Sequence, residues 1–101
     1  MQPWAPTLTP HQTRRAGKTA EELSELGSVL ARIQIQGLDD IDISSGKTNR
    51  QRLEEEIADV YAQLRLTVGS FDLDRIAILA RVEKKLALMA EWEAHFTKES
   101  A

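Results

Sequence analysis

Apolar residues recur every three or four positions along most of this chain, and no stretch shows the period-two alternation of a half-buried β-strand. Leu, Ala, Glu, Arg and Ile recur throughout, whereas aromatic residues make up only 5% of the sequence, and Gly and Pro occupy only 5 and 3 positions. This usage favours helices. The sequence therefore predicts an all-α fold, and its 101 residues are enough for one domain and no more.

Local signals place the ends of a first predicted helix. Thr9 followed by Pro10 is typical of an N-cap with proline at the first helical position. Gly37 is typical of a helix C-terminus, so the helix is expected to end there. Because Gly17 has a low helix propensity and would lie inside this helix, a helix that starts near Ala16 is the alternative.

A loop and two further helices are predicted after this first helix. The segment 37–46 is acidic and aperiodic, which indicates a loop. Thr48 and Gln51 have the spacing of a capping box, and the second helix is expected to continue from there to about Val68. The third helix is expected over 73–96. The predicted organisation is an irregular lead-in at 1–9, one helical domain at 10–96 and a C-terminal tail at 97–101.

The composition excludes several kinds of site. Without Cys, the chain cannot form a disulfide scaffold, a thiolate zinc site or a cysteine nucleophile, and its two His, His11 and His95, are too few for a histidine-rich metal centre. The formal net charge of -3 argues against a protein that coats nucleic acid. No apolar run approaches the ~18 residues of a membrane span, and no signal-type apolar segment stands at the start. We therefore expect a cytoplasmic protein without a membrane partner, whose chemistry uses carboxylates, amines and hydroxyls.

Two pairs of acidic residues stand out because of their spacing. Glu22 and Glu25 lie three residues apart on the first predicted helix, and Glu56 and Asp59 lie three residues apart on the second, so each pair projects from one side of its helix. A rotation of about 100° per residue places Glu22 within the apolar arc of the first helix, where an unpaired carboxylate is costly. If the two helices pack antiparallel across the loop, the four carboxylates converge on one point.

Simpler interpretations of these acids remain open. Thr19 and Glu22 themselves have capping-box spacing, so Glu22 is also compatible with a fraying first turn of the helix. On the second helix, the three consecutive acids at 54–56 are typical of a solvated face. Convergence of the four carboxylates would instead suit a hard divalent cation, Mg²⁺ with Mn²⁺ as a substitute. A di-iron bundle would need Glu-x-x-His pairs, and neither His lies near these acids.

The same acidic segments resemble a family signature. The segment EELSE at 21–25, followed after 30 residues by EIAD at 56–59, resembles the EExxE and ExxD motifs of the MazG-like superfamily. Those proteins are all-α nucleoside triphosphate pyrophosphohydrolases, related to dimeric dUTPases and dCTP pyrophosphatases. The resemblance covers about residues 10–95, and the segment 35–49 is most similar to short stand-alone members, many of them from phages and bacteria.

The resemblance implies a reaction and residues that perform it. The metal ligands would be Glu22, Glu25, Glu56 and Asp59. Glu21 would order or deprotonate the attacking water, while the cation would neutralise triphosphate charge and lower the pKa of a bound water. The enzyme would hydrolyse a nucleoside triphosphate between its α- and β-phosphates, which releases a monophosphate and pyrophosphate. Such an activity serves in housecleaning of the nucleotide pool.

Basic residues for the triphosphate are expected on the third helix and near the loop. The family usually places a lysine late in the chain, and Lys85 matches that position. Helical periodicity puts Lys85 on the flank of the apolar arc, with Arg81 on the same side as a lesser candidate. Lys47 and Arg50, beside the start of the second helix, are further candidates, although bases near loops more often face solvent.

Self-association is expected for two reasons. Apolar residues such as Leu66 and Trp92 lie at the edges of the apolar arcs of the helices, where they look exposed, and the predicted metal and nucleotide site must exclude water. We predict a homodimer or homotetramer in which helices of different copies pair, so that self-association of the three-helix chain completes a four-helix-bundle-type core. Two alternatives from other classes remain, namely a non-catalytic helical interaction module and an inactive MazG-like protein that binds nucleotide or metal. The base and the sugar of the substrate are not indicated by any motif.

Overall fold

The computed structural model describes residues 7–100, with side chains up to residue 96; residues 1–6 and 101, which include most of the predicted lead-in, lie outside the described part. Its helices are α1 (Pro10–Gln36), α2 (Asn49–Ser70) and α3 (Arg75–Ser100). Between residues 7 and 100 there is no strand, only an isolated bridge between Ile41 and Thr48. The predicted all-α fold is therefore confirmed. None of the helices in this part of the chain is sufficiently long and apolar to cross a bilayer.

The first two helices begin where their capping signals predict. Thr9 Oγ1 accepts a hydrogen bond from the Gln12 backbone N–H at 3.1 Å, and the Gln12 side chain accepts one from the Thr9 N–H at 3.0 Å. Thr48 and Gln51 form the same reciprocal pair at 3.1 and 3.0 Å. Each pair satisfies two backbone donors that would otherwise have no partner at a helix start. The alternative start of the first helix near Ala16 is therefore wrong.

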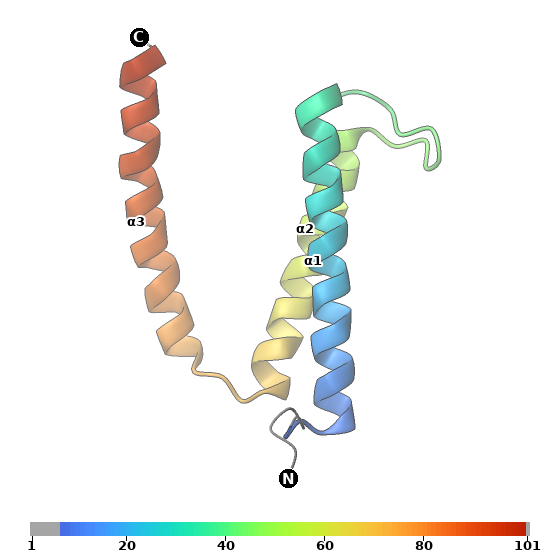
Figure 1. Cartoon of the computed structure of the whole chain (residues 1–101), viewed down its shortest axis with the longest axis vertical. Helices are drawn as coiled ribbons and strands as arrows, with labels where there is room; N and C mark the ends of the chain where they lie inside the picture. Colours follow the sequence, from blue (N-terminus) through green and yellow to red (C-terminus); the bar gives the residue numbers. More distant parts are fainter. Residues whose placement is uncertain (1–6, 101) are drawn as a thin grey trace.

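Helices α1 and α2 lie side by side and antiparallel (Figure 1). Val29 of α1 and Val60 of α2 are the only apolar side chains buried among the residues with described side chains. At the end away from the loop, Gln12 Nε2 donates to the backbone oxygen of Ser70 at 3.1 Å. The interface between the two helices thus combines a small apolar centre with polar contacts.

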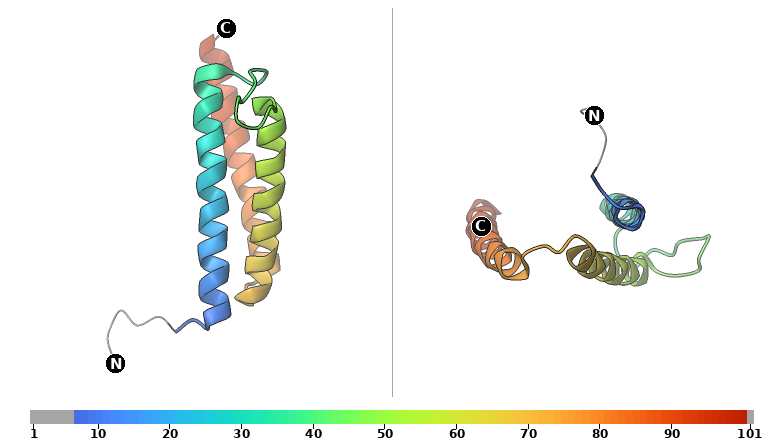
Figure 2. Two further views of the ribbon diagram at one scale, coloured as in Figure 1. Left: turned by 90° about the vertical axis from the view of Figure 1, so that its right-hand side faces the viewer. Right: turned by 90° about the horizontal axis from the view of Figure 1, so that it is seen from below.

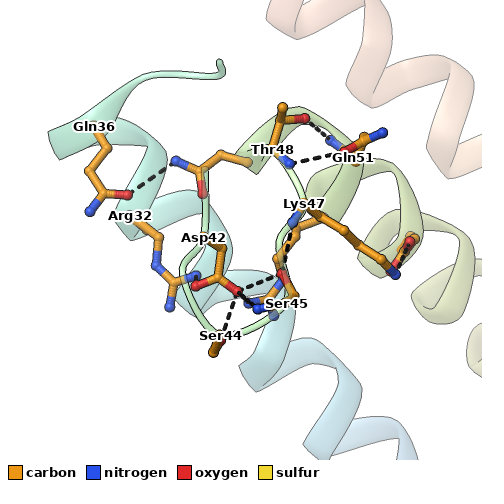
Figure 3. Close-up of polar contacts among 11 residues, drawn as sticks. Arg32, Gln36, Asp42, Ser44, Ser45, Lys47, Thr48 and Gln51 are labelled. Atoms are coloured by element: carbon orange, nitrogen blue, oxygen red, sulfur yellow. Dashed lines mark hydrogen bonds and ion pairs between the residues drawn. The ribbon is translucent and has the colours of Figure 1, made fainter. Parts of the chain in front are cut away.

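The loop between α1 and α2 is organised around Asp42 (Figure 3). Asp42 Oδ2 accepts hydrogen bonds from the hydroxyls of Ser44 and Ser45 at 2.9 and 2.7 Å. It also accepts one from Arg52 of α2 at 3.0 Å, while Oδ1 lies 3.4 Å from Arg32 of α1. The two serine hydroxyls, followed by the two arginines, hold the pKa of Asp42 well below its ordinary value. One carboxylate therefore joins the loop to both helices.

The third helix begins two residues later than predicted and ends four residues later. It begins at Arg75 because Asp74 caps it, with the Asp74 side chain accepting from the Ala77 N–H at 3.0 Å. Just before, Asp72 has a φ of 51°, a left-handed conformation that a helix cannot contain. At its other end, α3 continues to Ser100 and so includes four residues assigned to the predicted C-terminal tail.

Helix α3 extends away from the pair formed by α1 and α2, and the three helices do not close into a bundle (Figures 1 and 2). Most of its large apolar side chains are exposed, with Ile76, Leu86 and Trp92 at 81%, 58% and 54%. The radius of gyration is 17.9 Å, whereas a compact domain of this length has about 13 Å. A single chain therefore leaves a helix with an apolar surface uncovered.

Candidate metal centre

The pairing of α1 and α2 buries a carboxylate at the helix interface. The buried residues of α1 are Thr19, Glu22 and Val29, whose spacings of three and seven residues place them on the side that faces α2. Glu22 is only 8% exposed, although this side of a helix is ordinarily apolar. Because α1 begins at Pro10, Glu22 lies near the middle of the helix, and its interpretation as part of a fraying first turn is wrong.

Three of the four predicted metal ligands converge. One carboxylate oxygen from each of Glu22, Glu56 and Asp59 lies within 4.8 Å of the other two. Glu22 Oε2 and Glu56 Oε2 are buried and have no hydrogen-bond partner among the described residues. A buried acceptor without a partner is costly, and a cation would satisfy both oxygens. The donors are all carboxylate oxygens, the ligands that Mg²⁺ and Mn²⁺ prefer, so these residues fit a divalent cation.

Two acids in and beside this cluster, Glu56 and Glu25, have a raised pKa. Burial is the main reason that the pKa of Glu56 lies above its ordinary value, and the charges of Glu25, Asp59 and Glu22 raise it further. The pKa of Glu25 is also raised, chiefly by the charge of Glu22, with smaller contributions from burial and from Glu21. Negative charge is therefore concentrated here, and a bound cation would favour the ionised carboxylates.

Two further predicted acids lie at the edge of the cluster. Glu25 is exposed and is not one of the three residues whose oxygens converge, so its role as a fourth ligand stays a prediction. Glu21 is exposed, and its Oε2 lies 3.6 Å from Lys18 Nζ, which is equally far from Glu22 Oε1. The charges of Glu21 and then Glu22 raise the pKa of Lys18, so this ammonium stays protonated beside the cluster.

The predicted phosphate-binding residues are not brought to the acidic cluster within one chain. Arg81 and Lys85 line a pocket of about 630 Å³ on α3, where the other lining residues are apolar. Helix α3 itself lies apart from α1 and α2 (Figure 1). Lys47 and Arg50 each form an ion pair with another acid, at 2.6 and 3.3 Å. Their roles in phosphate binding stay predictions.

Sequence reasoning missed a row of polar residues that continues from Glu22 towards the start of α1. The hydroxyls of Thr19 and Thr67 share a hydrogen bond of 2.8 Å, and Arg15 Nη1 donates to Gln63 Oε1 at 2.7 Å. On α1, Arg15, Thr19 and Glu22 are spaced by four and then three positions, which is the repeat of residues that face a partner helix. That spacing is the signal in the sequence, but a search for apolar repeats passes over it because the side chains are polar.

The arrangement is suited to bind a hard cation that a ligand can reach from solvent. Glu22 closes the cluster on the side of the helix interface, whereas Asp59 and Glu25 are exposed. A cation held in this way can neutralise the charge of a phosphate group and act as a Lewis acid.

Comparisons of the chain with protein-family models, with curated proteins and with solved structures found no match.

Proposed function

We propose that this chain is a Mg²⁺-dependent nucleoside triphosphate pyrophosphohydrolase that acts in housecleaning of the nucleotide pool. The observation that carries the proposal is the convergence of Glu22, Glu56 and Asp59 within 4.8 Å, with two buried oxygens that have no hydrogen-bond partner in the described part. Like charges at a helix interface are destabilising unless something binds them, and apolar residues would pack there more favourably. The resemblance of the segments 21–25 and 56–59 to the MazG-like motifs supports the same function.

The acids have two roles in this proposal, metal binding and activation of water. Glu22, Glu56 and Asp59 would hold Mg²⁺, with Glu25 as the fourth ligand. When bound, the ion supplies charge neutralisation and Lewis-acid activation of the triphosphate. Glu21 is next to the ligand Glu22 and exposed to solvent, and we assign to it the positioning and deprotonation of the attacking water.

The reaction is a hydrolysis at the α-phosphorus. The oxygen of water forms a bond to this phosphorus, and the proton that the water loses passes to the carboxylate of Glu21. The bond between the α-phosphorus and the oxygen that bridges to the β-phosphorus breaks. Pyrophosphate leaves with the bridging oxygen, and the nucleoside monophosphate keeps the oxygen of the water.

The working unit in this proposal is a homodimer or a homotetramer. The exposed apolar surface of α3 and the extended shape of the single chain support it, because such a surface is ordinarily covered in a folded protein. In a four-helix-bundle-type assembly, α3 would pack against helices of a second copy. That packing would bring Arg81 and Lys85 towards the bound nucleotide.

Release of pyrophosphate tests the function directly. A panel of common and modified NTPs and dNTPs is incubated with the full chain and Mg²⁺ or Mn²⁺, and equal amounts of monophosphate and pyrophosphate are expected. Glu56→Gln removes a ligand charge and should lower kcat/KM by about 100-fold or more. Glu54→Gln makes the same change at an exposed position of the same helix and should leave activity unchanged.

Each negative result has a separate meaning. If no nucleotide yields pyrophosphate, the proposed activity is wrong. If Glu56→Gln is as active as the unmodified chain, the assignment of the metal centre is wrong. An inactive MazG-like protein would show a Mg²⁺-dependent rise in Tm without pyrophosphate release, and a helical interaction module would show neither.

A further inference from the structure

A second group of charged residues lies beside the acidic cluster on α1. The residues His11, Arg14, Arg15 and Lys18 line a pocket of about 210 Å³, which we call the α1 basic pocket. Positions three, four and seven residues apart share a face of a helix, so the pocket lies on the side of α1 that also carries Glu22 and Glu25. Along this side, the charge changes from positive to negative at Lys18.

The arginines of the α1 basic pocket have donors available for a ligand. The side chain of Arg14 forms no hydrogen bond or ion pair with any residue that the structure describes. Arg15 uses Nη1 to donate to Gln63, but its Nε is buried without a hydrogen-bond partner among the described residues. Neither is paired with a carboxylate, whereas Arg32 and Arg52 both bind an aspartate. An anion in the pocket would satisfy the exposed donors of Arg14, which the described part of the chain leaves without partners.

Lys18 connects the α1 basic pocket to the acidic cluster. Its Nζ forms ion pairs at 3.6 Å with an oxygen of Glu21 and with one of Glu22, and its side chain is half exposed, so that a phosphate can approach it from solvent. A rise of about 1.5 Å per residue puts Lys18 about 6 Å and Arg14 about 12 Å from Glu22 along the helix axis. A ligand with several phosphates in a row would extend from a cation at the cluster to these bases, and a single phosphate would not.

We propose that the α1 basic pocket binds the β- and γ-phosphates of the nucleoside triphosphate and holds them as the pyrophosphate leaving group. Arg14, Arg15 and Lys18 are its donors, and the inference rests on the function proposed above for the acidic cluster. Negative charge develops on the pyrophosphate as its bond to the α-phosphorus breaks, and fixed cationic donors stabilise that charge. The phosphate-binding residues of α1 then come from the same chain as the metal ligands, in addition to those expected on α3.

Calorimetric titration of the full chain with inorganic tripolyphosphate in EDTA separates this pocket from the metal centre. The unmodified chain should bind tripolyphosphate more tightly than orthophosphate. Arg14→Ala should weaken tripolyphosphate binding by about tenfold or more, because charge-assisted hydrogen bonds are lost. Arg14 is exposed and has no partner among the described residues, so this change leaves the fold intact. Lys84→Ala, an exposed change of the same charge on α3, is the matched control and should alter the affinity by less than about twofold.

The results separate this inference from the proposed function. Glu56→Gln should retain tripolyphosphate binding in EDTA while it loses hydrolysis. Binding that depends on Arg14 in a chain that hydrolyses no nucleotide would support the pocket and overturn the assignment of its ligand as a substrate. If the unmodified chain binds no tripolyphosphate, or if Arg14→Ala and Lys84→Ala weaken it equally, the α1 basic pocket is not a phosphate site.

Discussion

Replacing Glu56 with glutamine should stabilise the fold in the absence of divalent cations, even though it removes a proposed metal ligand. Glutamine keeps the size of the side chain and removes a charge that raises the electrostatic energy of the cluster. The oxygens of Glu22 and Glu56 that converge lie within 4.8 Å of each other. Two unit charges at this distance repel by about 3.5 kcal/mol at an effective permittivity of 20, and by about 0.9 kcal/mol in water. Because Glu56 is only half-buried, we expect about 1 kcal/mol, which corresponds to a rise in Tm of about 4–8 °C.

Unfolding followed by circular dichroism, first in EDTA and then in Mg²⁺, measures both halves of this prediction. In EDTA, Glu56→Gln should be more stable than the unmodified chain. At a Mg²⁺ concentration of about 100 times Kd, the unmodified chain gains about 2.7 kcal/mol, and the variant gains less because a ligand is missing. Glu54→Gln should behave like the unmodified chain in both buffers. A less stable Glu56→Gln in EDTA would refute the repulsion, and an equal gain from Mg²⁺ would refute binding at Glu56.

Three further predictions follow from other parts of the structure. Asp42→Asn should lower the Tm at neutral pH, because the pKa of Asp42 is lowered in the folded state. The carboxylate then stabilises the fold in full above its ordinary pKa of about 4, and this stabilisation is lost progressively as the pH falls from there towards the lowered pKa. Melts at pH 7 and pH 3 should show the difference from the unmodified chain narrowing at the lower pH, and a constant difference would contradict this. Thr19→Val should cost about 0.5–1.5 kcal/mol in urea unfolding, since it removes the hydrogen bond between the Thr19 and Thr67 hydroxyls while Thr67 still donates to the Gln63 carbonyl; no change would show that the pair does not contribute. In light scattering, the unmodified chain should have the mass of the proposed oligomer, and Leu86→Glu on α3 should have the mass of a monomer; a monomeric unmodified chain would contradict the proposed assembly.

The starts of α1 and α2 could be predicted from the sequence because a few neighbouring residues determine each of them. The hydroxyls of Thr9 and Thr48 each meet a glutamine three residues later, and both caps form as expected. The start of α3 was placed too early, because Asp72 adopts a left-handed conformation and Asp74 provides the cap. An aspartate is compatible with either role, so the sequence pattern alone does not distinguish between them.

The acidic cluster could be predicted in part because its geometry depends on only two helices. Spacing puts Glu22, Glu56 and Asp59 on definite sides of α1 and α2, and the loop between these helices allows them to pack antiparallel. The relation of Lys85 to this cluster depends instead on where α3 packs. Contacts remote in sequence determine that packing, and periodicity within α3 does not report them. The sequence pattern does not reveal that Arg15 lies at the helix interface, because positions at such an interface are recognised by apolar residues and Arg15 is charged.

Among the described residues, ion pairs join the two helices only at the loop end of the α1–α2 pair, where the neutral side chain of Asn49 also donates hydrogen bonds to Gln36 and to the backbone oxygen of Gly37. At the loop, the ion pairs of Asp42 join the helices (Figure 3). At the opposite end, neutral hydrogen bonds join Gln12 to Ser70 and Thr19 to Thr67. Dissolved salt weakens attraction between charges, with a screening length that falls from about 10 Å at 0.1 M to about 3 Å at 1 M, but acts little on neutral hydrogen bonds. A rise in ionic strength is therefore a directional perturbation of this molecule, because it weakens the Asp42 ion pairs at the loop end and leaves the hydrogen bonds at the end with the α1 basic pocket nearly unchanged.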